Sequence, residues 1–374
     1  MKIAFVSDTV YPYFKGGKEN RLYGLSTHLA ALGHEVHIYT MHWWQGPETV
    51  RLEDGVYLHA ICRKYELYHG DRRSILEGTA FGLACLKLIT VQADVIDVDQ
   101  MPFFPVFSAW LVCLLRGKKL YGTWHEALSA QEWVKYMGAT GYIAAAIEAL
   151  SVRLPHHITA ASLHTQRLLA TRHHRTRRVD VVTPGIDMAV AQHISPAQNA
   201  CNVLYVGRLV KDKHVDTLIR AMRHVVRQKP DATCIIIGQG IELSNLTRLI
   251  HQLKLETNVT VIPPLSAATD VYAYMKRANV FVLPSVREGF SMVTLESLAC
   301  GTPIVTTNSS ANASKDLIAD GKTGSIVTLD DDAFAAAILH WMGTDKEPVA
   351  ITNSVKDFDW QSLARKQAEI YLAQ

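Results

Sequence analysis

The strongest constraint on the fold comes from residues 280–307, which read as strand, loop, helix and strand in succession. The apolar run 280–283 is typical of a buried strand. A helical pattern follows over 290–299, and Gly301 stands where a left-handed helix cap would stand. A second β-rich run covers 304–307. Strands joined through a helix are usually parallel, so this unit predicts a parallel sheet covered by helices.

The same order of strand, loop and helix repeats along the rest of the chain. Further apolar, β-rich runs lie at 2–7, 36–40, 94–99, 118–123, 158–162, 179–183, 202–206, 232–237 and 259–262. We therefore expect an α/β protein built of doubly wound parallel sheets. In such sheets ligands bind at the carboxyl ends of the strands.

A chain of 374 residues is long enough for two domains. The turn-forming sequence at 183–187 suits a hinge, and residues 188–200 read as an irregular linker. We therefore expect one domain over 1–185 and a second over 186–357. A long helix is expected over 127–154 in the first domain.

Two glutamates stand eight residues apart in the 280–307 unit. Glu288 precedes the predicted helix, and Glu296 lies nearly two turns inside it. The helix start offers amide groups and the positive end of the helix dipole. A carboxylate there accepts hydrogen bonds from sugar-like hydroxyls. The pair suggests a ligand with two polyol parts, such as a sugar nucleotide, although two solvated charges explain the pattern equally well.

Two basic residues occupy the loop after the strand at 202–206. Arg208 follows Gly207, and Lys213 immediately precedes a helical pattern. An Arg fork and a Lys point charge at a helix start suit a diphosphate, although charged loops of this kind are common. Gly238 and Gly240, after the next strand, would allow backbone to approach a ligand closely.

Taken together, these motifs resemble retaining glycosyltransferases of the GT-B fold, family 4 (glycosyl transferases group 1), with two facing Rossmann-like domains. The resemblance spans essentially the whole chain. It is most specific over 203–214, like the family's G-R-x(4)-K element, and over 283–307, like its E-x7-E signature. It is looser over 1–40 and 118–126. It also implies that the last helix, 358–374, packs back on the first domain.

The resemblance implies a role for each matching residue. Arg208 and Lys213 would stabilise the leaving nucleoside diphosphate, UDP or GDP. Glu288 would hold the donor sugar and Glu296 the ribose, while His125, after the strand at 118–123, would contact the transferred sugar. The implied catalytic residues are His125, Arg208, Lys213 and Glu288, and the implied donor-binding residues are Gly16, Gly17, Gly207, Arg208, Lys213, Gly238, Gly240, Leu265, Glu288, Phe290, Ser291, Met292, Val293 and Glu296.

Two segments depart from the family pattern. Pro263 and Pro264 stand where relatives have glycine near the nucleobase, so the base stays open. Ser291 stands where many relatives have glycine beside the sugar. The acceptor implied by the family is a hydroxyl of a glycan, a lipid or a small molecule.

No cofactor or metal is expected, because the family uses two basic side chains and a helix dipole where other enzymes use a cation. Asp97 and Asp99 form a D-x-D pattern that holds a divalent metal in the other major glycosyltransferase fold. Acids at the carboxyl end of a parallel strand explain this short pattern more simply.

Composition narrows the setting of the protein. A net charge of +3 argues against a dedicated nucleic-acid-binding protein. The six cysteines include no CxxC pair and predict reduced thiols in a cytoplasmic protein. The N-terminus lacks the apolar segment of a signal peptide, and the apolar stretch 103–115 is too short to span a bilayer.

One basic cluster stands out in the first domain. It contains Arg167, Arg172, Arg175, Arg177 and Arg178, with His173 and His174. Such a cluster suits phosphates or the inner face of an anionic membrane, and a solvated helix end explains it equally well.

Two other functions use the same scaffold. One is a non-catalytic sugar-nucleotide-binding protein, and the other is a sugar-nucleotide epimerase. Epimerases lack the combined Arg–Lys loop and E-x7-E pattern. The basic pair and His125 disfavour the non-catalytic protein.

Overall fold

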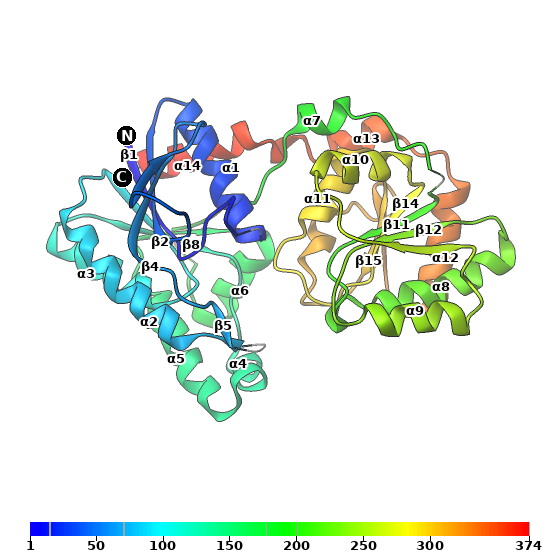
Figure 1. Ribbon diagram of the computed structural model, residues 1–374, viewed down its shortest axis with the longest axis horizontal. Helices are drawn as coiled ribbons and strands as arrows, with labels where there is room; N and C mark the ends of the chain where they lie inside the picture. The colour runs from blue at the N-terminus through cyan, green and yellow to red at the C-terminus, as the bar shows by residue number, and fades with distance from the viewer. Residues whose placement is uncertain (15, 70–71, 177, 200, 374) are drawn as a thin grey trace. The chain divides into compact units, whose positions relative to one another are not determined.

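The computed structural model describes residues 1–14, 16–69, 72–176, 178–199 and 201–373 (Figure 1). The chain divides into two compact units. The N-terminal unit comprises Met1–Gly185 and Trp360–Gln374, and the C-terminal unit comprises Ile186–Asp359. The last helix, α14 (Trp360–Leu372), thus belongs to the N-terminal unit.

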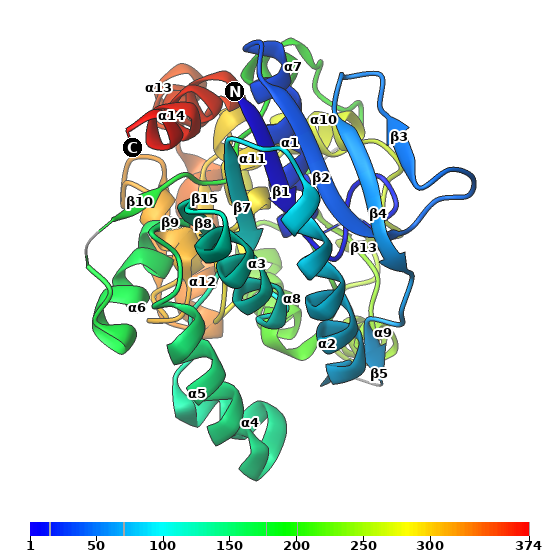
Figure 2. The ribbon, with the colours of Figure 1, turned by 90° about the vertical axis from the view of Figure 1, so that its left-hand side faces the viewer.

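The N-terminal unit is built on an eight-stranded sheet of order β10-β9-β8-β7-β1-β2-β4-β3 (Figure 2). All neighbouring pairs are parallel except β3 with β4. The strands are β1 (Lys2–Val6), β2 (Glu35–His42), β3 (Thr49–Arg51), β4 (Tyr57–Arg63), β7 (Val95–Asp99), β8 (Leu120–Trp124), β9 (His157–Ala160) and β10 (Val179–Val181). Strands β5 (Tyr68–His69) and β6 (Arg72–Arg73) form a separate hairpin.

Helices cover both faces of this sheet, because β1 is apolar on both sides. Ile3 and Phe5 are buried in one core cluster, with residues of α1 (Gly17–Ala31) and α14. Ala4 and Val6 are buried in another, with residues of α2 (Ile75–Ala84) and α3 (Phe104–Leu115). This alternation with a period of two places each set on its own face.

Further helices complete the N-terminal unit. They are α4 (Ala130–Met137), α5 (Gly141–Ser151) and α6 (Leu163–His173), with the short 3-10 turns η1 (Cys85–Thr90) and η2 (Gly138–Thr140). The long helix expected over 127–154 is therefore wrong. Gly138 has a φ of +69°, and this left-handed backbone separates α4 from α5.

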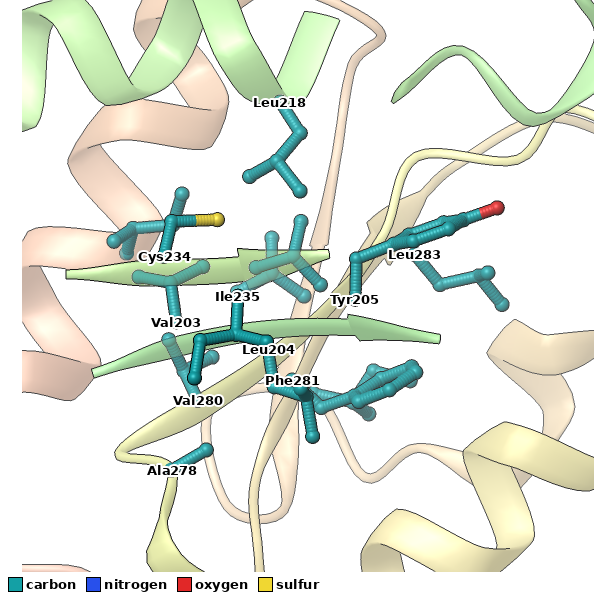
Figure 3. Packing of buried hydrophobic residues seen from close by; sticks show 14 of the residues in the cluster. Val203, Leu204, Tyr205, Leu218, Cys234, Ile235, Ala278, Val280, Phe281 and Leu283 are labelled. Carbon is teal, nitrogen blue, oxygen red and sulfur yellow. The ribbon is translucent and has the colours of Figure 1, made fainter. Parts of the chain in front are cut away.

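The C-terminal unit contains a wholly parallel six-stranded sheet of order β13-β12-β11-β14-β15-β16. Its strands are β11 (Val203–Val206), β12 (Cys234–Ile237), β13 (Val259–Ile262), β14 (Val280–Leu283), β15 (Ile304–Thr307) and β16 (Gly324–Val327). Figure 3 shows how Leu204 and Phe281 of the paired strands β11 and β14 extend into the core, where both are fully buried.

Helices also cover both faces of the second sheet (Figure 1). One face carries α8 (Val215–Gln228), α9 (Leu243–Gln252) and α12 (Asp331–Gly343), and the other carries α7 (Met188–His193), α10 (Ala268–Arg277), α11 (Met292–Ala299) and α13 (Pro348–Asn353). The 3-10 turns are η3 (Lys211–Lys213), η4 (Ala313–Leu317) and η5 (Lys356–Phe358). The linker expected over 188–200 is partly wrong, because Asp187 caps α7 by accepting from the amide of Val190.

The expected α/β fold with doubly wound parallel sheets is confirmed by these two layers of helices around each sheet. No helix in the described ranges is both long and apolar enough to cross a membrane.

Candidate functional site

Each sheet has one point where the strand order reverses. In the C-terminal unit this point lies between β11 and β14, which are neighbours although β12 and β13 separate them in sequence. Loops that leave two such strands diverge to opposite faces, so a crevice opens at their carboxyl ends. Arg208 and Lys213 follow β11, and Glu288 and Glu296 follow β14. The four residues therefore flank one switch point.

The loop after β11 holds the two basic residues. The buried Tyr205 hydroxyl donates to the carbonyl of Arg208 at 2.9 Å and so fixes the start of the loop. The Arg208 side chain is exposed and has no hydrogen-bond or ion-pair partner in the described part of the chain. Lys213 ends the 3-10 turn η3, whose Asp212 carbonyl accepts from the amide of Val286 at 3.4 Å. This bond ties the loop after β11 to the loop after β14.

Lys213 and Glu288 form an ion pair, with 2.5 Å between Nζ and Oε1. Their side chains are 17% and 11% exposed, so solvent screens the pair only partly. The Glu288 backbone is held on both sides: its amide donates to Ala311, and its carbonyl accepts from Ala313. The carboxylate is thus presented from a backbone that the neighbouring loop fixes in place.

Two of the predicted glycines are required by close packing of these loops. A Cβ on Gly238 would lie 2.0 Å from the Gly207 carbonyl oxygen. A Cβ on Gly240 would lie 2.2 Å from the carbonyl oxygen of Leu209. The backbone of the loop after β12 therefore rests directly on the loop that carries Arg208.

Helix α11 begins at Met292, two residues later than the helical pattern suggested. Ser291 is its N-cap, and its hydroxyl accepts from the amide of Thr294 at 3.4 Å. Serine takes this position because its oxygen satisfies one of the helix's unpaired amides. The amides of Met292 and Val293 lie in the first turn, where anions bind.

Glu296 lies in the second turn of α11, among Tyr272 and Cys300. Within the described residues its carboxylate has no hydrogen-bond or ion-pair partner. Burial raises the pKa of Glu296 to about 7. A partly buried carboxylate without a described partner is available to accept hydrogen bonds from a ligand.

Three of the predicted donor-binding side chains have a packing role as well. Leu265, Phe290 and Val293 are partly buried and pack against the C-terminal core. Phe290 also lies near Phe358, with 6.4 Å between the ring centroids. Their side chains therefore shape the edge of the sheet, whatever their backbone groups bind.

In the N-terminal unit the strand order reverses between β1 and β7. Gly16 is the N-cap of α1, and Gly17 is its first residue. A Cβ on Gly17 would meet no atom within 4 Å, so the described chain leaves space at this helix start. Lys18 follows, and its side chain points to the acids of both strands flanking the switch point: Asp8 at 2.5 Å and Asp99 at 3.8 Å.

His125 follows β8 and is held on three sides. Its Nε2 lies 2.8 Å from Asp99 Oδ1, and its backbone amide donates to Gln100 Oε1 at 2.7 Å. Its carbonyl accepts from the Thr165 hydroxyl at 2.8 Å. The ring is 22% exposed, so one edge remains accessible while Asp99 fixes the orientation.

Asp8, Lys18 and Arg73 form a second group that the sequence motifs did not reveal. The Asp8 side chain is completely buried and pairs with both Lys18 and Arg73. Lys18 stands directly after Gly17, and Asp8 follows the first strand, so the sequence pattern places both next to the predicted ligand-binding loop. No such pattern places Arg73, because it lies in the two-residue strand β6.

The two acids of the D-x-D pattern are used by the protein itself. Asp97 accepts from the Tyr371 hydroxyl at 2.6 Å and from Thr123 at 3.0 Å, and burial raises its pKa to about 6. Burial also acts on Asp99, but Lys18 and His125 outweigh it and lower the pKa of that carboxyl. No group of three or more His, Cys, Asp or Glu that could hold a metal ion occurs among the described residues.

Only part of the basic cluster predicted around residue 175 lies together among the described residues: Arg175 and Arg178 line one pocket. Arg172 pairs with Glu132 at 2.6 Å and also donates to the Ala127 carbonyl. Arg175 donates to the carbonyls of Pro155 and His156. Arg178 is exposed, and Arg177 lies outside the described residues.

Comparison with protein families agrees with this arrangement. The sequence model for glycosyl transferases group 1 matches residues 193–358, and that for glycosyltransferase family 4 matches residues 15–190. The chain belongs to the family 4 glycosyltransferases. The two matches leave only residues 1–14, 191–192 and 359–374 uncovered.

Curated relatives of this glycosyltransferase are sugar-transferring enzymes. Glycogen synthase of Mycobacterium tuberculosis is 28% identical over 100% of this chain and 95% of its own. The D-inositol 3-phosphate glycosyltransferase of Pseudarthrobacter chlorophenolicus is 30% identical over 40% of this chain and 38% of its own. The glycosyltransferase described here is therefore an enzyme that transfers a sugar.

Solved structures show the same fold. Sucrose-phosphate synthase of Thermosynechococcus elongatus superposes with a TM-score of 0.77 at 18% identity, covering 100% of this chain and 98% of that one. Anabaena Alr3699/HepE, solved in complex with UDP, superposes with a TM-score of 0.76 at 18% identity over 100% of both chains. The GT-B fold of this glycosyltransferase is thus confirmed.

Proposed function

We propose that this glycosyltransferase takes its sugar from a nucleoside-diphosphate sugar and retains the configuration at the anomeric carbon. One observation carries the proposal. Two cations and two carboxylates, Arg208, Lys213, Glu288 and Glu296, flank the single switch point of the C-terminal sheet. A nucleoside-diphosphate sugar has an anionic diphosphate between two hydroxyl-rich rings. The two cations suit the diphosphate, and the two carboxylates suit the hydroxyls of the rings. Anabaena Alr3699/HepE, which shares the fold, has been solved with UDP-glucose.

In this proposal Arg208 and Lys213 hold the diphosphate. Arg208 has no partner among the described residues, so its guanidinium is available for two parallel bonds to phosphate oxygens. Lys213 is engaged with Glu288 at 2.5 Å, and a diphosphate would share this ammonium. As the bond to the sugar breaks, negative charge grows on the leaving phosphate. Fixed cations at that position stabilise the transition state more than the ground state.

The two glutamates bind the rings on either side of the diphosphate. Glu288 accepts from hydroxyls of the donor sugar, with the amides of Phe290 and Ser291 beside it. Glu296 accepts from the ribose. The absence of a described partner for Glu296 supports this role, because hydrogen bonds from ribose hydroxyls would offset the desolvation of its carboxylate.

In the N-terminal unit we assign His125 and Gly17 to the sugar that is transferred. The Nε2 atom of His125 is occupied by Asp99 at 2.8 Å, so Nδ1 is the atom left for a substrate hydroxyl. Asp99 acts as a positioning residue, because it fixes the ring and holds its tautomer.

Retention follows from attack on the face that the diphosphate leaves. The acceptor hydroxyl oxygen bonds to the anomeric carbon while the bond from that carbon to the phosphate oxygen breaks. The hydroxyl proton passes to an oxygen of the departing phosphate. Glu288 is not assigned as a covalent nucleophile, because its carboxylate already pairs with Lys213. No metal is assigned to the reaction, since the two cations supply the charge that it would bring.

The acceptor is a hydroxyl of a glycan, a lipid or a small molecule. Relatives include the glycogen synthase above and a Campylobacter jejuni galactosaminyltransferase whose name specifies a diphospho-undecaprenol substrate. We propose a cytoplasmic enzyme.

The test is a thermal-shift panel of UDP, GDP, ADP and their monophosphates. We expect one diphosphate to raise the unfolding temperature more than its monophosphate, because a ligand that binds only the folded state stabilises it. The α-linked sugar donor of that base is then incubated with candidate acceptors. An α-linked product, read by NMR, supports retention. A β-linked product, or no diphosphate that stabilises the chain, would refute the proposal.

A further inference from the structure

A basic pocket lies at the edge of the N-terminal sheet opposite to His125. Lys118 and Lys119 precede β8, His156 precedes β9, and Arg178 precedes β10. These three strands are parallel, so their amino ends meet at one edge. His125 follows the carboxyl end of β8. A five-residue strand separates the two edges by about 16 Å. The pocket is therefore distinct from the predicted sugar-transfer residues.

The pocket has a volume of about 550 Å³, and its charge is of one sign. Five side chains that line it are permanent cations, namely Lys118, Lys119, Arg153, Arg175 and Arg178. None of the described residues that line it is acidic. Surfaces of ordinary proteins intersperse charges of both signs, so such a set repels itself unless an anion binds.

Two buried side-chain nitrogen atoms at this pocket are unused. His156 Nδ1 and Arg175 Nε are shielded from solvent and have no hydrogen-bond partner in the described chain. Burial and the nearby Arg178 and Lys119 lower the pKa of the His156 imidazole. Burial and Arg178 lower the pKa of the Arg175 guanidinium. After burial, the neighbouring cations are the next cause of both lowered pKa values.

The geometry suits a compact anion. Arg175 is anchored through its NH2 group, which donates to Pro155 and His156 carbonyls at 2.8 and 3.2 Å. This anchoring fixes the guanidinium at the pocket wall, so it loses little freedom on binding. Lys119 and Arg178 are exposed at the pocket, where they can close on a ligand. Multiple charged donors around one cavity are the usual receptor for phosphate oxygens.

We propose that this pocket binds a phosphate or diphosphate group at a site separate from the sugar-transfer site. The ligand is either a soluble phosphate compound or the headgroup of an anionic lipid. Trp110 and Leu114 also line the pocket, and Leu111 and Leu115 are exposed on the same helix, α3. The phosphate group is the feature that both ligand sources share.

The test uses inorganic pyrophosphate as the probe, titrated calorimetrically into a Lys213→Ala chain. That background weakens binding at the basic pair of the C-terminal unit. The effect of changing Lys119 and Arg178 is measured against it, so failure of the donor-site proposal and failure of this one are distinguishable. Lys119→Ser with Arg178→Ser changes only exposed side chains, so the fold should be retained. We expect this double variant to weaken pyrophosphate binding at least about tenfold, through loss of two charged donors. The matched control, Arg223→Ser with Lys229→Ser, removes two exposed cations of the C-terminal unit and should leave binding unchanged.

A second arm uses vesicles of phosphatidylglycerol, with phosphatidylcholine vesicles as the neutral reference. Vesicle binding that is lost in the Lys119→Ser, Arg178→Ser variant, without pyrophosphate binding, assigns the site to a lipid headgroup. Pyrophosphate binding lost in that variant assigns it to soluble phosphates. Binding to neither probe, or binding equal in the two double variants, would overturn the proposal.

Discussion

The two switch points of this enzyme use charge in opposite ways. In the N-terminal unit the charges satisfy one another: Asp8 pairs with Lys18 and Arg73, and Asp99 pairs with His125. Of the four charged candidate residues at the C-terminal switch point, Lys213 and Glu288 pair with each other, whereas Arg208 and Glu296 have no described partner. The first network holds a histidine in place, whereas the second leaves groups available for a ligand. We therefore expect the largest loss of stability from a substitution in the N-terminal unit and the largest loss of sugar transfer from one in the C-terminal unit.

The largest effect is expected at Asp8. Its carboxylate is fully buried between Lys18 and Arg73, so Asp8→Ala removes the nearest anion from both cations and leaves them only the longer contacts to Asp99 and Glu77. Breaking a buried ion pair in this way costs about 3–5 kcal/mol. Denaturant titration that follows the N-terminal unit should show this loss. Glu53→Ala, at an exposed acid of the same unit, should change stability by less than about 0.5 kcal/mol. Equal losses in both variants would remove the contrast between the units.

Lys213→Ala should lower kcat/KM. The loss of transition-state stabilisation should be about 3–4 kcal/mol, as expected for one preorganised group that stabilises developing charge. The free energy of unfolding should change little, because the side chain is at the edge of the sheet. Lys211→Ala is the matched control, since Lys211 is an exposed cation in the same 3-10 turn. Near-normal turnover by Lys213→Ala would show that the basic pair does not stabilise the leaving group.

Asp99→Asn tests whether the N-terminal network serves catalysis through His125. The charged hydrogen bond to His125 is worth about 1.5–3 kcal/mol, and its loss should lower kcat with little change in donor KM. A purely structural role would change stability and leave the pH profile of kcat unaltered. The profile of Asp99→Asn should instead change, because the variant removes the Asp99 carboxyl, whose pKa Lys18 and His125 lower against the effect of burial.

Glu296→Gln gives the smallest effect and has a definite pH dependence. In the folded chain the pKa of Glu296 is about 7, above the ordinary carboxyl value of 4.5. Between these two pH values the folded state therefore binds a proton that the unfolded state has lost. Stability contributed by this group is therefore lost as pH rises from about 4.5 to 7. Glu296→Gln should stabilise the C-terminal unit at pH 8 by about 1–3 kcal/mol and have no effect below about pH 4.5.

The same variant should bind nucleoside diphosphate more weakly, since the amide replaces the ribose-binding carboxylate. Glu347→Gln, at an exposed acid of the same unit, is the control. An increase in stability without weaker ligand binding would refute the ribose role.

The sequence predicted the C-terminal site better than the N-terminal one, for a physical reason. Arg208, Lys213, Glu288 and Glu296 lie within short segments that end strands, so local patterns locate them. The N-terminal network joins residues far apart in sequence, such as Asp8 with Arg73 and Asp99 with His125. Only the folded chain brings these partners together. Contacts between residues far apart in sequence also divide the predicted arginine cluster. Arg172 forms an ion pair with Glu132, whereas Arg175 donates a hydrogen bond to the Pro155 carbonyl.

Strand and helix boundaries were predicted where apolar periodicity was strong. They were missed where one residue decides the backbone, as Gly138 does between α4 and α5 or Ser291 does at the start of α11. Residues 41–93, which form β3, β4, α2 and the β5–β6 hairpin, carried no pattern that we could assign. The two strands of this hairpin, β5 and β6, have only two residues each, which is too few for an alternating pattern to show.

The central claim is that the C-terminal switch point binds a nucleoside diphosphate. Calorimetric titration of the diphosphate that best stabilises the chain tests it most directly, in wild type, Lys213→Ala, Lys211→Ala and Asp99→Asn. We predict that Lys213→Ala weakens binding at least about tenfold, while Lys211→Ala and Asp99→Asn bind as wild type does. Equal affinity in Lys213→Ala and wild type would contradict the claim.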